Sequence, residues 1–171
     1  MSTFRSLLPV VLALAAAAHS GCGYTTRSQY RQNVSTIAVP IWHRAADEYR
    51  REIEIRLTES LVKRIEAETP YKVVDRSQAD TVLEGTLRRV EQFVLSYDPR
   101  TRQAREIQAR FLVDFTWKDL RTGKVLVERK KFPVTAEYIP PCPFRENFFL
   151  GSEDAVNKLA QRIVEQLAEP W

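Results

Sequence analysis

Cys22 is the residue whose surroundings define a chemical event most clearly. It stands in the pentapeptide Ser20-Gly21-Cys22-Gly23-Tyr24, directly after an apolar run. Small residues ahead of such a cysteine are typical of a signal peptidase that cuts before a lipid-modified cysteine. The position three places before the cysteine is usually aliphatic, and His19 departs from this pattern. On the small residues before Cys22 we favour its acylation at the mature N-terminus, with plain secretion and removal of the same peptide as the alternative.

The first 21 residues have the parts of a secretory signal. Arg5 supplies a positive start, and the apolar stretch from Leu7 to Ala18 is interrupted only by Pro9. This stretch is shorter than the about 20 apolar residues that span a bilayer. We expect a signal peptide over 1–21, a lipidated N-terminus and tether over 22–33, and one domain over 34–171.

The net charge is too small to indicate a partner. The chain has 26 basic and 22 acidic residues, a formal charge of +4. Nucleic-acid binders carry dense basic patches, so we expect no nucleic-acid partner.

Two further residues could do chemistry, His43 and Cys142. His43 is the one histidine after the signal, and no Gly-x-Ser-x-Gly elbow or metal-binding motif accompanies it. Cys142 is flanked by prolines, and we interpret it as a tucked-in thiol. An intermolecular bridge, a reactive site or a disulfide to Cys22 remain alternatives. We predict no enzyme, no metal and no cofactor.

Arginines cluster around the predicted turn that follows Ser96. They are Arg100, Arg102, Arg105 and Arg110, and a second basic group comprises Arg121, Lys124, Arg129, Lys130 and Lys131. Charges on exposed strands deter edge-to-edge pairing. Alternatively, arginine forks grip phosphates, such as those of a glycolipid head group. Arg100, Arg102 and Arg105 are the candidate ligand-binding residues.

Two amphipathic helices are predicted to support these turns. Apolar residues at four-residue spacing favour a helix that begins with Asp47 as its N-cap, includes Tyr49 and stops at Thr69-Pro70. Ser152 is predicted as the N-cap of a second helix after the loop that ends at Leu150.

Strands are predicted between these helices. The runs are Val34–Trp42, Tyr71–Val74, Thr81–Ser96, Ala104–Asp119 and Val125–Ile139. Pro40 cannot donate to a ladder, so the first strand is expected to end there or to have its proline at an edge. The alternation over Ala104–Asp119 is the clearest, and Arg88-Arg89 predicts a bulge in the run before it, with Gly85 allowing a bend. At about 3.3 Å per residue these runs reach roughly 45–50 Å, so the hairpin is expected to twist strongly or to project beyond the helices.

The order β-α-β-β-β-β-α predicts an α+β fold. Two helices, each apolar on one face, need one apolar sheet face to cover. We expect a two-layer sandwich with both helices on one side of a mixed four- to five-stranded sheet.

Taken in order, several segments resemble the LptE family of lipopolysaccharide-assembly lipoproteins, in its divergent branch. They are Cys22-Gly23-Tyr24, Ile37-Ala38-Val39-Pro40-Ile41, Glu54-Ile55-Arg56-Leu57-Thr58-Glu59-Ser60-Leu61, Tyr71-Lys72-Val73-Val74 and Ala79-Asp80-Thr81-Val82-Leu83-Glu84-Gly85-Thr86. The resemblance implies an outer-membrane lipoprotein that plugs and helps assemble a β-barrel (LptD-like) partner delivering lipopolysaccharide to the cell surface. It also implies lipopolysaccharide binding through basic residues.

A second class of lipoprotein fits the same features. Similar small domains regulate wall-synthesis enzymes or form part of secretion and flagellar assemblies of the outer membrane. A β-barrel partner would favour the first class, and a synthase partner or a homo-oligomeric ring the second.

Overall fold

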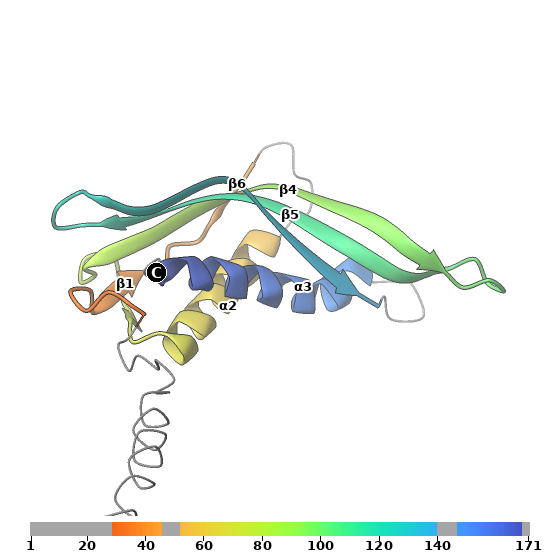
Figure 1. Cartoon of the computed structure of the whole chain (residues 1–171), viewed down its shortest axis with the longest axis horizontal. Coiled ribbons are helices and arrows are strands. Elements are labelled where there is room, and N and C mark those ends of the chain that lie inside the picture. Colours follow the sequence, from red (N-terminus) through yellow and green to blue (C-terminus); the bar gives the residue numbers. More distant parts are fainter. Residues whose placement is uncertain (1–28, 46–51, 140–146, 169–171) are drawn as a thin grey trace, which may run out of the picture.

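Two helices cover one face of a six-stranded mixed sheet in the computed structural model of the chain, which describes residues 29–45, 52–139 and 147–168 (Figure 1). The helices are α2 (Ile53–Glu68) and α3 (Asn147–Val164), and a 3-10 turn (Glu165–Leu167) follows α3. The predicted two-layer α+β fold, with both helices on one side, is confirmed.

The sheet has the order β3-β1-β4-β5-β6, and β2 pairs with β4 beside this path. Its strands are β1 (Thr36–Ala38), β2 (His43–Arg44), β3 (Lys72–Val73), β4 (Thr81–Tyr97), β5 (Ala104–Asp119) and β6 (Val125–Tyr138). β1 runs parallel to both β3 and β4, whereas β4, β5 and β6 form an antiparallel meander. The sheet is therefore mixed, with α2 as the crossover between β1 and β3.

The first strand ends before Pro40, one of the two expected outcomes, because β1 stops at Ala38 ahead of the residue that has no N–H to donate. Three other expectations were wrong. β2 is an additional strand, so the sheet has six strands rather than four or five. α3 begins at Asn147, which places Ser152 inside the helix and not at its N-cap. Nothing from Asn147 to Leu150 breaks a helix, so the favourable capping type of Ser152 did not decide the start. The first helix, α2, begins at Ile53 with Glu52 as its N-cap at φ +73°, so the expected N-cap at Asp47 was wrong. Asp47 and Tyr49 themselves lie outside the described residues.

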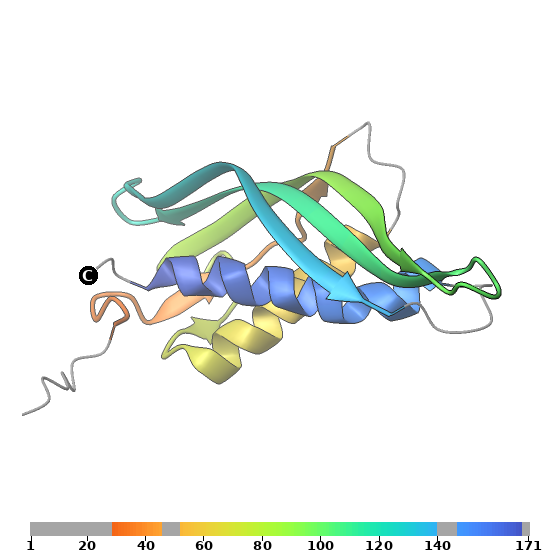
Figure 2. The same cartoon turned by 45° about the vertical axis from the view of Figure 1, so that its right-hand side comes forward.

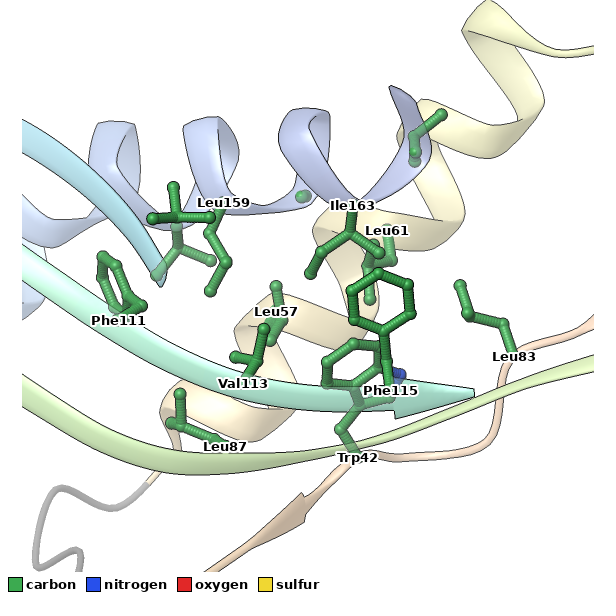
Figure 3. Close-up of a cluster of buried hydrophobic side chains, with 14 of the residues drawn as sticks. Trp42, Leu57, Leu61, Leu83, Leu87, Phe111, Val113, Phe115, Leu159 and Ile163 are labelled. Carbon is green, nitrogen blue, oxygen red and sulfur yellow. The ribbon is translucent and has the colours of Figure 1, made fainter. Parts of the chain in front are cut away.

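β5 supplies the centre of the core, as its alternation predicted. Its alternate residues from Ala109 to Trp117 are buried against the helices, whose apolar faces meet them (Figure 3). In α2 the four-residue spacing places Ile53, Leu57, Leu61 and Ile65 at full burial.

Gly85 has a role that differs from the predicted bend. A Cβ at this position would lie 2.5 Å from the ring of Trp42, which stacks on Phe115 with ring centres 6.2 Å apart. Trp42 enters the core between β1 and β2 (Figure 3). The absence of a side chain at Gly85 is what allows the indole to lie flat on β4.

The bulge predicted at Arg88-Arg89 is present, and it is tied to a second one. The β4–β5 register shifts between Leu87 and Arg89, and β6 is irregular around Lys131, whose φ is +52°. Asp114 accepts hydrogen bonds from Arg88 Nε and from the backbone N–H of Lys131, both at 2.7 Å. Burial favours a raised pKa for Asp114, but these bonds and the charges of Arg88 and Lys130 outweigh it and lower the pKa. The Asp114 carboxylate is therefore hydrogen-bonded to both irregular sites, through Arg88 on β4 and Lys131 on β6.

Candidate functional site

The candidate arginines lie on and beside the β4–β5 turn, at the far end of the sheet. This turn extends beyond the ends of both helices (Figures 1 and 2). Arg100, Arg102 and Arg105 are all exposed. The structure therefore brings the three predicted residues together on one projecting hairpin.

Asp98 shapes this turn. Its Oδ1 accepts hydrogen bonds from the backbone N–H groups of Arg100 and Thr101, at 2.9 and 2.8 Å. The Arg102 N–H donates to the carbonyl of Asp98, and Arg102 adopts a left-handed conformation with φ +56°. The bonds from Thr101 and Arg100 hold the pKa of Asp98 below its usual value.

The β5–β6 turn, at the other end of the sheet, has the same geometry. Asp119 Oδ1 accepts from the N–H groups of Arg121 and Thr122, at 2.8 and 3.0 Å. Gly123 takes the left-handed position with φ +73° and donates its N–H to the carbonyl of Asp119. The bond from Thr122, followed by that from Arg121, lowers the pKa of Asp119.

The arginines of the two turns differ in their contacts. Arg121 lies 3.7 Å from Asp80 and 3.9 Å from Asp119, and it donates to the carbonyl of Asn33 at 3.1 Å. Within the described part of the chain, the side chains of Arg100 and Arg102 make no ion pair. Their donors are therefore available to an anion, whereas those of Arg121 serve the fold.

Other members of the second basic group also have partners. Lys130 Nζ lies 3.1 Å from Glu128, and Arg129 Nε donates to Gln166 at 3.2 Å. These side chains are therefore engaged within the domain, and we do not assign a second anion site to this group.

The chain enters the domain next to the β5–β6 turn, through contacts that the sequence did not indicate. The Arg31 N–H donates to the hydroxyl of Tyr71 at 2.9 Å, and the Arg31 guanidinium lies 5.8 Å from the ring centre of Trp117. Tyr30 packs edge-on against Tyr71. The N-terminal side of the domain and the candidate arginines thus lie at opposite ends of the sheet (Figure 1).

The other chemical candidates are not assembled into a site. His43 lies exposed on β2, and Cys22 and Cys142 fall outside the described residues. No cluster of three metal-binding side chains occurs in the ranges 29–45, 52–139 and 147–168. None of the helices described there is long and apolar enough to cross a membrane.

The described residues form an α+β domain in which two helices pack on a mixed sheet and the β4–β5 hairpin carries exposed arginines. The chain belongs to the LptE family: the family model described as "Lipopolysaccharide-assembly" matches residues 34–169. This is a family of non-enzymatic bacterial lipoproteins of lipopolysaccharide assembly, which work with a β-barrel partner in the outer membrane. The resemblance inferred from the sequence is confirmed.

Solved structures share the fold at low identity. A protein from Xanthomonas campestris is 14% identical with a TM-score of 0.50, over 82% of this chain and 90% of that one. The PelC dodecamer from Paraburkholderia phytofirmans is 16% identical with a TM-score of 0.50, over 84% and 96%. Rare lipoprotein B from Shewanella oneidensis is 20% identical with a TM-score of 0.44, over 77% and 92%. The first two show the fold alone, and no curated protein matches the chain.

Proposed function

We propose that this chain is exported, acylated at Cys22 and held at the outer membrane, where it helps to assemble and plugs a β-barrel translocon for lipopolysaccharide. The observation that carries this proposal is the family match, which runs through the whole domain from residue 34 to 169. The signal-like segment 1–21 and the small residues before Cys22 support the anchor. Several acyl chains hold a protein to a bilayer far more firmly than one chain does.

Within this role, the β4–β5 turn binds lipopolysaccharide phosphates through Arg100, Arg102 and Arg105. The support is physical: Arg100 and Arg102 are exposed, close in sequence and without ion pairs in the described part of the chain. Guanidinium groups form paired hydrogen bonds with phosphate oxygens, and such bonds are among the strongest that side chains make. The turn's own carboxylate, Asp98, is occupied by backbone N–H groups.

The test is affinity purification of the full chain from detergent-extracted membranes, with mass spectrometry of its partners and of its N-terminal residue. We expect a large β-barrel protein to co-purify and an acylated Cys22 to begin the mature chain. A Cys22→Ala variant is the matched control, and it should lose both the acyl mass and membrane retention. Recovery of a wall-synthesis enzyme without a barrel, or an unmodified N-terminus, would contradict the proposal.

One alternative is a lipoprotein subunit of a secretion assembly, and a structural neighbour of the same fold is described as a dodecamer. The two functions differ in oligomeric state. A one-to-one complex with a barrel protein supports lipopolysaccharide assembly, and a homo-oligomeric ring in light scattering supports the alternative.

A further inference from the structure

Large apolar side chains are exposed at the outer end of β4. Phe93, Val94, Leu95 and Tyr97 are 42%, 41%, 46% and 61% exposed. We call these residues, 93–97, the outer β4 segment. Of the four other exposed large apolar residues in the described ranges, Ile41, Ile55 and Val125 lie elsewhere and singly. The fourth, Ile139, follows the end of β6, where Tyr138 pairs with Ile107. Concentrated exposed apolar surface marks an interaction site, whereas isolated residues do not.

At the inner end of β4, apolar side chains on the helix-facing side are buried. Leu83 and Leu87 are fully buried against the helices. Beyond Val94 the register with β5 shifts twice, first between Val94 and Ser96 and then between Ser96 and Tyr97. Leu95 therefore has no residue opposite it on β5. The turn that follows β4 extends beyond the ends of both helices (Figure 2). Phe93 pairs with Gln108 and so lies on the sheet face that the helices leave open, whereas Val94 pairs with Ile107 on the face that packs against the core.

Cations border the outer β4 segment. Only two residues separate Tyr97 from Arg100, and Arg102 and Arg105 follow on the same turn. Farther from the turn, the Arg110 guanidinium lies 5.2 Å from the centre of the Phe93 ring. An apolar strand end that continues directly into a basic turn matches a molecule whose hydrocarbon is covalently joined to phosphates.

We propose that the outer β4 segment binds the acyl chains of the anionic glycolipid whose phosphates the turn arginines hold. This inference rests on the proposed function and extends its site from the head group to the hydrocarbon. Leu95 and Tyr97 supply the contact nearest the turn, and Phe93 continues it along the strand. Burial of their exposed apolar surface on binding contributes free energy in proportion to the area removed from water.

The test compares two probes by calorimetry: detergent-dispersed lipopolysaccharide, and the same molecule after removal of its acyl chains with its phosphates kept. For the full chain with Leu95→Ser and Tyr97→Ser, we expect about tenfold weaker binding of intact lipopolysaccharide and unchanged binding of the deacylated probe. Tyr97→Ser alone should give a smaller loss in the same direction. Val125→Ser, a matched loss of exposed apolar surface at the start of β6, should change neither affinity.

Two results would overturn the inference and leave the phosphate site standing. One is equal affinity of the unmodified protein for both probes. The other is unchanged binding of intact lipopolysaccharide by the doubly substituted chain. If that chain binds lipopolysaccharide normally but no longer co-purifies with a protein, the outer β4 segment contacts that protein and not the acyl chains. Failure of the unmodified protein to bind either probe would overturn the proposed phosphate site as well.

Discussion

The β4–β5 and β5–β6 turns lie at opposite ends of the sheet and share one backbone design. Each begins with an aspartate whose Oδ1 accepts two backbone N–H groups, and each has a left-handed residue four places later. The sequences are Asp98-Pro99-Arg100-Thr101-Arg102-Gln103 and Asp119-Leu120-Arg121-Thr122-Gly123-Lys124.

The two turns differ in what their side chains contact. At the β5–β6 turn, Arg121 is bonded to the fold and Gly123 takes the left-handed position without strain. At the β4–β5 turn, Arg100 points to no carboxylate among the described residues, and Arg102 occupies a conformation that costs a non-glycine residue about 1 kcal/mol. The residues of the β5–β6 turn are therefore explained by their contribution to stability. The β4–β5 turn carries exposed cations at a position where stability favours glycine, and we propose that binding explains them.

The largest expected effect separates the two turns by charge reversal. Arg100→Glu with Arg102→Glu should weaken lipopolysaccharide binding about 100-fold, because two charge-assisted hydrogen bonds are lost, and should leave the melting temperature unchanged. Arg121→Glu is the matched control. It should lower the melting temperature, since it places a third carboxylate beside Asp80 and Asp119, and should keep the affinity. Loss of binding by the Arg121 variant alone would reverse the assignment.

A packing change tests the inner half of β4 against the outer half. Gly85→Ala places a methyl group against Trp42 and should destabilise the fold by about 2 kcal/mol. Urea unfolding measures this loss, and Leu95→Ser should leave the unfolding midpoint unchanged. Equal stability of the Gly85 variant would show that Trp42 can move away at little cost.

Asp80, at the β5–β6 end, should contribute to the acid sensitivity of the domain. Backbone N–H bonds, first that of Ser35, lower the pKa of Asp80, with Thr36 and Arg121 adding to the effect. A lowered folded-state pKa gives stability that is present above the ordinary aspartate pKa, about 4, and lost as the pH falls through the folded value. Asp80→Asn should cost about 1 kcal/mol near neutral pH and lose less stability than the unmodified protein between about pH 5 and about pH 3. Parallel pH profiles for the two proteins would contradict this cause.

The smallest effect comes from exchanging the left-handed residues. Arg102→Gly should stabilise the domain by about 0.5 kcal/mol, and Gly123→Arg should destabilise it by about 1 kcal/mol. Chemical unfolding of both single variants checks the signs. If Arg102→Gly also weakens lipopolysaccharide binding, this side chain contributes to the site at a cost in stability.

Periodic segments could be predicted from sequence because one face decides their structure. The alternation from Ile107 to Trp117 and the four-residue spacing from Ile53 to Ile65 both gave the buried faces correctly. The bulge at Arg88-Arg89 was visible as a break in the alternation of apolar and polar residues.

Contacts between distant residues could not be predicted in this way. Gly85 suggested a bend, but its role depends on Trp42, which lies 43 positions earlier. Asp114 looked like an ordinary outward-facing residue, although it joins Arg88 to the Lys131 backbone. For the candidate site, sequence located the arginines. That Arg121 is bonded within the fold while Arg100 is not required the structure, because Asp80 and Asn33 are remote in sequence from the turn.

The most direct test of this account is site-specific photo-crosslinking in living cells. A photoreactive amino acid replaces Arg100 in one strain and Arg121 in another, and crosslinked products are probed for lipopolysaccharide after irradiation. We predict capture of lipopolysaccharide from position 100 and none from position 121. Capture from position 121 with none from position 100 would contradict the claim that the projecting turn is the binding end of the molecule.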